Sequence, residues 1–325
     1  MRSVRRLMVV ALAAVMLGAT GCGSANESSP AAAGTADVAE AATIRVASNS
    51  NASVLTMWVA LEKGIFAKHG LDVKYTKVEN IGTLPPAVGK SFDIVFVTPV
   101  QAIAATAQGI PLTEVAGSST DTTQAVNSYL MVKKGSSITS LQGMKGKTIG
   151  VLTAVGTLHY ATLNMLKKAG VEPSDVKIVQ VDGPSQLAQL SAGRVDAVET
   201  LAPFSEQLKK NGAVNLGVPF ESLSDSISVI WWAAGTEWAA KHADEATKFR
   251  ESLAEAETFI EQNDAEARTV LQKYSGFPAD VVKAFPLPDY DSSVRPQDLP
   301  IWLQVMKDVA GFKGNVDVSK LAVQP

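Results

Sequence analysis

The chain has 325 residues, of which 46% are hydrophobic and 19% charged, and its formal net charge is −3. This composition supports a large core, and a mildly acidic chain without a basic cluster argues against a nucleic-acid partner. A single cysteine, Cys22, excludes a disulfide within the chain, and the histidines His69, His159 and His242 are too scattered to give metal-ligand spacing. We therefore expect neither a metal nor a cofactor.

Residues 1–21 have the organisation of an export signal. Three arginines precede a continuous apolar stretch over residues 7–17, which is shorter than the roughly 20 residues that a membrane-spanning helix needs. Small residues then lead to Cys22, and this arrangement resembles a bacterial lipobox, in which the cysteine is lipidated and becomes the new N-terminus. The alternative is an ordinary secretory signal with an incidental cysteine. We predict a lipoprotein signal peptide and a cell-membrane anchor through Cys22 on the extracytoplasmic side.

Residues 22–43 are small and polar and have no periodicity, which is typical of a flexible linker. From residue 44 onwards, short β-branched or apolar segments alternate with segments of helical spacing, several of which end at glycine. The predicted strands are residues 44–48, 71–75, 92–97, 112–116, 129–132, 148–151, 176–181, 197–199 and 227–233. The predicted helices are residues 52–68, 100–108, 160–169, 186–192, 241–262, 265–274, 279–285 and 300–310.

This alternation predicts an α/β protein with mostly parallel sheets flanked by helices and with a helical C-terminal region. The predicted strands are too many for one ordinary sheet, so we expect two lobes. The chain would cross between them near residues 127–129 and 226–229. Lobe 1 would then comprise residues 44–127 plus 229–325, and lobe 2 residues 128–228.

Six segments in order carry a family resemblance. They are residues 59–73 (VALEKGIFAKHGLDV), 92–99 (FDIVFVTP), 141–150 (LQGMKGKTIG), 156–160 (GTLHY), 190–197 (LSAGRVDA) and 316–321 (VDVSKL). They resemble the solute-binding proteins of ABC importers, in the group that binds aliphatic sulfonates, taurine, nitrate or thiamine precursors. The resemblance implies a two-lobe, type II periplasmic-binding-protein fold. It also implies a monomer whose partners are a small-molecule ligand, ABC permease subunits and, through Cys22, the membrane.

One segment departs from the pattern of that group. Members usually carry Trp-Glu/Asp-Pro-Tyr/Phe after the Val-Asp-Ala motif, whereas this chain has Leu201-Ala202-Pro203-Phe204. An aromatic ring and a carboxylate are missing there, so the specificities of well-known members do not transfer to this chain.

The turns that follow the predicted strands are the candidate ligand site. In open parallel sheets ligands bind outside the carboxyl ends of the strands, and two lobes would place two such edges across a cleft. The candidate ligand-binding residues are Ser48, Asn49, Asn51, Thr98, Gln101, Ser118, Ser119, Gly156, Thr157, His159, Asp182, Leu201 and Trp231. These turns contain no lysine or arginine, which favours a ligand that is neutral, zwitterionic or a monoanion.

Several of these candidates have structural alternatives. Thr157 and the polar residues 48–51 would also serve as caps of the helices that follow them. His159 would either donate to the ligand or pack on the inner face of its helix, and Asp182 before Gly-Pro is typical of a turn. Trp231 and the next tryptophan must point to opposite faces of their strand, one towards the cleft and one towards the core.

We therefore predict a binding protein that closes around a small polar molecule, such as a sulfonate, a nitrate-like anion, a carboxylate or a heteroaromatic compound, and delivers it to an ABC importer. One alternative is an enzyme on the same scaffold, similar to a pyrimidine-precursor synthase, although no Gly-x-Ser-x-Gly elbow is present. Another alternative is a receptor that presents its closed form to a sensor protein.

Overall fold

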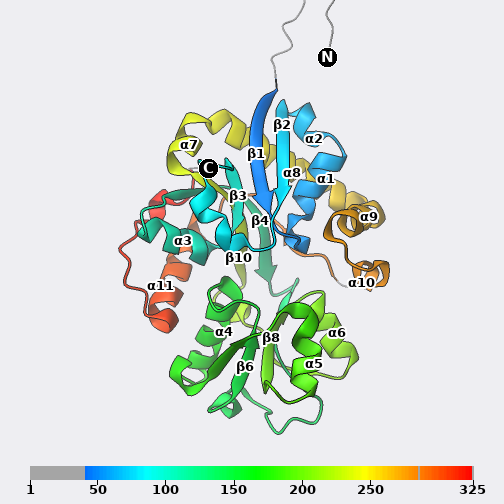
Figure 1. Cartoon of the computed structure of the whole chain (residues 1–325), viewed down its shortest axis with the longest axis vertical. Coiled ribbons are helices and arrows are strands. Elements are labelled where there is room, and N and C mark those ends of the chain that lie inside the picture. Colours follow the sequence, from blue (N-terminus) through cyan, green and yellow to red (C-terminus); the bar gives the residue numbers. More distant parts are fainter. Residues whose placement is uncertain (1–40, 285, 324–325) are drawn as a thin grey trace, which may run out of the picture. The chain divides into compact units, whose positions relative to one another are not determined.

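The computed structural model describes residues 41–284 and 286–323, and these residues form two mixed sheets. Figure 1 shows the helices and strands with the labels used below. The predicted signal peptide, Cys22 and most of the predicted linker lie outside the described residues. Within them, no helix combines the length and the apolar character that crossing a membrane requires.

The six-stranded sheet has the strand order β11-β4-β10-β3-β1-β2. Its strands are β1 (Ala42–Ser48), β2 (Leu71–Lys77), β3 (Ile94–Val97), β4 (Leu112–Thr122), β10 (Ser226–Gly235) and β11 (Asp289–Tyr290). β1 pairs in parallel with β2 and β3, whereas β10 is antiparallel to both β3 and β4. Therefore β1, β2, β3 and β4 run in one direction, and β10 is inserted between β3 and β4 in the opposite direction.

The five-stranded sheet has the order β7-β6-β8-β5-β9. As in the six-stranded sheet, one strand runs antiparallel to both of its neighbours. Its strands are β5 (Ser128–Val132), β6 (Thr148–Val151), β7 (Lys177–Gln180), β8 (Ala197–Leu201) and β9 (Val214–Gly217). β6 is parallel to β7 and β8, and β5 is antiparallel to β8 and β9. The chain passes between the two sheets in residues 123–127 and 218–225, close to the predicted crossings. The lobe boundaries stay a prediction.

The helices confirm the predicted α/β class and the helical C-terminal region. They are α1 (Leu55–Glu62), α2 (Ile65–Lys68), α3 (Pro99–Ala107), α4 (Thr157–Lys168), α5 (Gln186–Ser191), α6 (Phe204–Lys210), α7 (Thr236–Lys241), α8 (Ala243–Gln262), α9 (Asp264–Ser275), α10 (Ala279–Ala284) and α11 (Leu299–Ala310). The helix predicted over residues 52–68 is divided at Gly64, whose φ of 66° suits glycine and interrupts the α-helical backbone. The sequence did not indicate α6, α7, β9 or β11, since the predicted helix over residues 241–262 corresponds to α8.

The core of the six-stranded sheet follows the two-residue period of its strands. Phe96 and Trp232 belong to the hydrophobic cluster on one face, which α1, α8 and α9 cover (Figure 1). Val97 and Trp231 belong to the cluster on the other face, under α3 and α11. The two tryptophans therefore point to opposite faces, as predicted. Both are buried in hydrophobic clusters, so the expectation that one of them faces the cleft was wrong.

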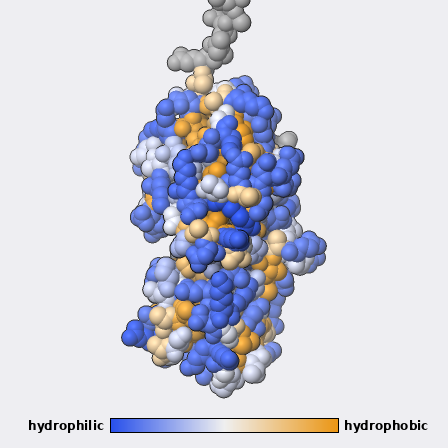
Figure 2. All heavy atoms as spheres, turned by 90° about the vertical axis from the view of Figure 1, so that its right-hand side faces the viewer, coloured by the Kyte–Doolittle hydropathy of each residue, from blue (hydrophilic) through white to orange (hydrophobic). Residues whose placement is uncertain are grey.

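The outer surface is largely polar. Figure 2 shows one face on which hydrophilic residues dominate and hydrophobic areas are small. Among the described residues, the large hydrophobic side chains that remain exposed are Val155, Ile178, Val179 and Val214. The described residues therefore bury most of their large apolar side chains, which is the main source of stability in a chain without disulfides.

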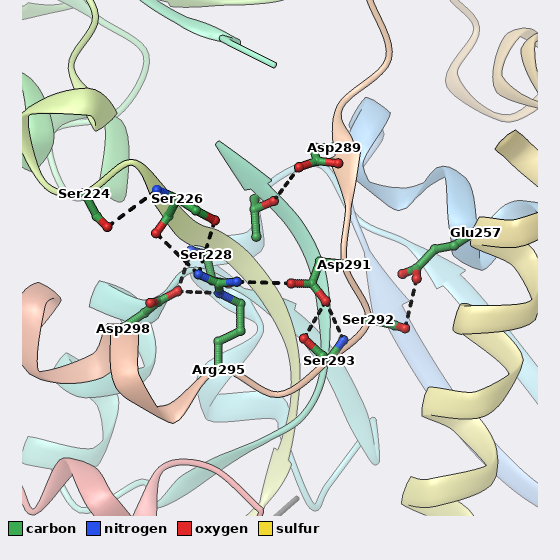
Figure 3. Close-up of polar contacts among 11 residues, drawn as sticks. Ser224, Ser226, Ser228, Glu257, Asp289, Asp291, Ser292, Ser293, Arg295 and Asp298 are labelled. Carbon is green, nitrogen blue, oxygen red and sulfur yellow. Dashed lines mark hydrogen bonds and ion pairs between the residues drawn. The ribbon is translucent and has the colours of Figure 1, made fainter. Parts of the chain in front are cut away.

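A strap formed by residues 289–298 is fastened to β10 by Arg295 (Figure 3). The Nε atom of Arg295 donates to Asp298 Oδ2 at 2.7 Å, and the same oxygen accepts the backbone N–H of Ser228 at 2.7 Å. The other guanidinium nitrogens donate to Asp291 and to Ser226, each at 3.3 Å. Asp298 is only 3% exposed, so its charge depends on these donors.

The strap also lies directly against β4. Thr120 Oγ1 donates to Asp289 Oδ2 at 3.2 Å, and the N–H of Gly117 donates to the carbonyl of Ser292 at 2.9 Å. A Cβ atom on Gly117 would lie 2.2 Å from the carbonyl oxygen of Asp291. Because no side chain fits this approach, Gly117 allows the strap to hold β4 as well as β10.

We expect Arg295→Ala to lower the free energy of unfolding by about 3 kcal/mol, because it leaves the buried Asp298 carboxylate without its cation. Urea denaturation at pH 7 measures this loss. Arg194→Ala is the matched control, since Arg194 is exposed and its hydrogen bond to Gln189 is long at 3.5 Å; its effect should stay within about 0.5 kcal/mol. Equal losses in the two variants would contradict a structural role for the strap.

Candidate functional site

A cavity of about 500 Å³ opens where the strands of both sheets end. The six-stranded side contributes residues 49–53 after β1, residues 79–81 after β2 and residues 119–121 near the end of β4. The five-stranded side contributes residues 155–158 before and within α4 and residues 201–204 after β8. These are carboxyl ends of strands. Except after β4, which leads to β5, the loops there lead into helices or 3-10 turns and leave backbone N–H groups free for a ligand. A second cavity of about 220 Å³ lies elsewhere, between α8 and the strap.

Most of the predicted site residues lie on the wall of the larger cavity. Those that line it are Asn49, Asn51, Thr98, Gln101, Ser119, Gly156, Thr157 and Leu201. They come from both sheets, so the structure brings together residues that are far apart in the sequence. Their contact with a ligand stays a prediction.

The other predicted residues lie away from that wall. Ser48 is buried and shares a hydrogen bond of 2.8 Å with the hydroxyl of Tyr75. Ser118 donates to the carbonyl of Ser53 at 2.6 Å. Asp182 is exposed and precedes a short 3-10 turn, as its turn-forming alternative predicted. Trp231 is 1% exposed within a hydrophobic cluster, and His159 is described below.

Three of the lining residues also cap helices. The N–H of Gln101 donates to Thr98 Oγ1 at 3.3 Å, and the N–H of Thr98 donates to Gln101 Oε1 at 3.0 Å, which forms a capping box at the start of α3. Asn51 Oδ1 accepts the N–H of Ser53 at 2.8 Å. The capping alternatives therefore hold for these side chains, which leaves them fewer free atoms for a ligand.

The amino end of α4 differs, because no side chain caps it. Its N-cap residue is Gly156, and Thr157 Oγ1 donates across to the carbonyl of Val229 at 3.3 Å instead of capping. The first-turn N–H groups of α4 therefore lack a side-chain acceptor, and the helix dipole makes this end electropositive. Such an end suits an anionic or carbonyl group of a ligand.

His159 is paired inside the protein. Its Nδ1 atom lies 3.2 Å from Glu199 Oε2, and the two residues are 5% and 0% exposed. Burial raises the pKa of Glu199, and the hydrogen bond from His159 counteracts part of that shift. His159 does not line the cavity, so the geometry favours the packed alternative over a ligand donor.

Charged groups on the cavity wall are all acidic. Among the described residues that line it, Glu79 and Asp121 are ionisable, and none is lysine, arginine or histidine. Asp121 is 2% exposed, and its Oδ2 accepts the N–H of Asn127 at 3.1 Å. Burial raises the pKa of Asp121 to about 7, although the hydrogen bond from Asn127 lowers it. The described part of the chain contains no cluster of metal-ligating side chains that could hold an ion.

Sequence reasoning missed Asp121 because it ended the strand at residue 116, whereas β4 continues to Thr122. The continuation is rich in serine and threonine, residues that are common in turns, and its burial depends on pairing with β10. One signal in the sequence pointed to it. Asp121 is an acid shortly before the predicted crossing at residues 127–129, where the chain leaves the first sheet.

The architecture resembles solved periplasmic binding proteins. The aliphatic sulphonate-binding protein SsuA from Escherichia coli has a TM-score of 0.72 and 18% identity over 87% of this chain and 92% of that chain. The nitrate-binding protein NrtA from Synechocystis PCC 6803 has a TM-score of 0.71 and 14% identity over 87% of this chain and 86% of that chain. These similarities establish the periplasmic-binding-protein fold, which confirms the fold that the resemblance implied.

A family model described as NMT1/THI5 like matches residues 51–267, and the chain belongs to this family. The taurine-binding periplasmic protein of Escherichia coli (strain K12) is 32% identical over 136 residues, which cover 39% of this chain. The match also spans 39% of that relative, so about two fifths of its length corresponds to this chain. The relative and the solved structures named here are binding proteins, in agreement with the predicted family.

We expect His159→Ala to lower the free energy of unfolding by about 3 to 5 kcal/mol, because it removes the partner of the buried Glu199 carboxylate. His159→Gln keeps a hydrogen-bond donor and should lose clearly less. Urea denaturation of both variants measures the difference. A loss of less than about 1 kcal/mol in the free energy of unfolding of His159→Ala would show that the pair has no structural role. It would then favour the alternative that His159 donates a hydrogen bond to the ligand.

Proposed function

We propose that this chain is an extracytoplasmic solute-binding protein that captures a small polar molecule and delivers it to an ABC importer. The observation that carries the proposal is the cavity of about 500 Å³, whose wall is built from the carboxyl ends of strands in both sheets. Membership of the NMT1/THI5-like family and similarity to a taurine-binding protein support the same function. We infer that the ligand leaves the protein chemically unchanged.

Binding would combine the uncapped amino end of α4 with the polar side chains of the opposite wall. Ligand contact with both sheets would favour a closed arrangement over an open one, because only the closed arrangement satisfies both sets of contacts. The residues of the two crossings, 123–127 and 218–225, are where the backbone would change between these states. The permease subunits would then distinguish the closed form from the open form.

We expect a ligand to raise the melting temperature of the protein by about 5 °C at a concentration of 100 times its dissociation constant, which corresponds to about 2.7 kcal/mol. Thermal-shift measurements with taurine, ethanesulfonate, nitrate, propionate and 3-(aminomethyl)pyridine cover the proposed ligand classes. Mass spectrometry of the released compound should return the original mass. A changed mass would favour an enzyme.

Two exposed valines provide a matched pair of variants for this experiment. Val155 lines the cavity and is 52% exposed, and Val214 lies on β9 and is 51% exposed. Val155→Trp adds bulk at the cavity wall and should weaken binding by about tenfold, or 1.4 kcal/mol, whereas Val214→Trp should leave it unchanged. Equal effects of the two variants would contradict binding in this cavity.

We also propose that the chain is anchored through Cys22, which lies outside the described residues. In a bacterial host supplied with an alkyne-tagged fatty acid, the full chain should become labelled and sediment with membranes. Cys22→Ser should lose the label and appear in the soluble extracytoplasmic fraction. Labelling that persists in Cys22→Ser would contradict lipidation at this residue.

A further inference from the structure

The cavity combines a buried acid with a complete lack of basic side chains on its described wall. Asp121 is 2% exposed, Glu79 is exposed at the edge, and no lysine, arginine or histidine lines the cavity in the described part of the chain. A purely anionic ligand would therefore enter a space whose fixed charges repel it. A ligand with a positive group would find a carboxylate with little competing water.

Asp121 has no cationic partner within the described protein. Its Oδ2 accepts the N–H of Asn127 at 3.1 Å, and the nearby charge that acts on it, Glu221, is also negative. Elsewhere in the described chain, the buried carboxylate of Asp298 does have a cation, because Arg295 donates to it at 2.7 Å. Glu114 is also fully buried, and neither of its carboxylate oxygens has a hydrogen-bond partner in the described chain, but it does not line the cavity. A buried carboxylate without a counter-ion is costly in free energy, and at Asp121 a ligand in the cavity would supply the missing charge.

A structural role alone does not explain the acid at this position. The hydrogen bond from Asn127 closes the turn at the first crossing, and an asparagine at position 121 would accept it equally well without carrying a charge. The side chain of Ser128 also stabilises the charged carboxylate, but burial outweighs both donors and raises the pKa of Asp121 to about 7. Asp121 therefore keeps a carboxylate on the cavity wall that has hydrogen-bond donors but no cation among the described residues, and a cationic group of a ligand would supply one.

Three further polar atoms on the cavity wall have no hydrogen-bond partner among the described residues. Asn49 Oδ1, Ser50 Oγ and Asn127 Oδ1 are buried and accept or donate no hydrogen bond within the protein, and all three residues line the cavity. The two amide oxygens can only accept. Asn127 lies next to Asp121, because its N–H donates to that carboxylate, so its free amide oxygen and the carboxylate would both accept from a group with several N–H donors.

We infer that the ligand carries a protonated amine or a similar cationic donor group, and that Asp121 binds this group. The inference rests on the proposed binding function and refines its ligand class. The electropositive end of α4 lines the same cavity, so the site suits a small zwitterion, whose anionic part lies at α4 and whose cation lies at Asp121. Asp121 is then the residue that determines specificity for the cation.

Calorimetry with three matched pairs of compounds tests this inference. The pairs are taurine and ethanesulfonate, β-alanine and propionate, and 3-(aminomethyl)pyridine and 3-methylpyridine, and within each pair only the amine differs. For at least one pair we expect the amine to bind the wild-type protein about tenfold or more tightly, because a charge-assisted hydrogen bond is lost with the amine.

Asp121→Asn should abolish this preference, since it keeps the acceptor for Asn127 and removes the charge. For a pair with an anionic group, the variant should bind the amine-free compound at least as tightly as the wild type does, which also shows that the variant is folded. Asp244→Asn is the matched control, because Asp244 is an exposed acid that does not line the cavity, and its effect should stay below about threefold.

The outcomes separate this inference from the proposed function. Tight binding of an amine-free compound without preference for its amine, or a preference that survives in Asp121→Asn, would overturn the inference and leave the binding function intact. If no compound of any pair binds the wild-type protein, the proposed function is overturned for these ligand classes. The inference about Asp121 is then overturned as well.

Discussion

The cavity depends on the direction in which the strands run. In the six-stranded sheet β1, β2 and β3 run one way, as β6, β7 and β8 do in the five-stranded sheet, so in each sheet their carboxyl ends and the turns after them meet at one edge. The chain leaves the first sheet through β4, enters the second as β5 and returns as β10, and both β5 and β10 run against their neighbours. These two reversed strands let one chain connect two sheets whose ligand-binding edges border the same cavity.

The chemistry of the cavity follows from what this edge exposes. Strand-to-helix turns provide backbone N–H groups, and side chains cap some of them, as Thr98 and Gln101 do at α3. The amino end of α4 keeps its donors because Gly156 has no side chain and Thr157 bonds to Val229. Asp121 and the unpaired amide oxygens of Asn49 and Asn127 line the same cavity and provide acceptors. The cavity is therefore polar on both sides without a basic side chain among its described lining residues.

The C-terminal region stabilises the strands that reach this cavity. β4 and β10 carry lining residues at their ends, and the strap over residues 289–298 holds both strands through hydrogen bonds and the Arg295 ion pairs. The two buried pairs, Arg295 with Asp298 and His159 with Glu199, satisfy charges that would otherwise destabilise the core. Asp121 and Glu114 are buried without such a pair among the described residues, and of these two Asp121 lines the cavity.

The sequence by itself determined the α/β class, most helices and strands and the family, because hydrophobic periodicity, glycine stops and ordered motifs are local signals. It also located many lining residues, since the turns after strands are recognisable without a structure. It could not separate lining residues from caps or buried pairs: Ser118, His159 and Trp231 were equally plausible until packing placed them inside. The length of β4, and with it the position of Asp121, was decided only by pairing with β10, a contact between residues far apart in the chain.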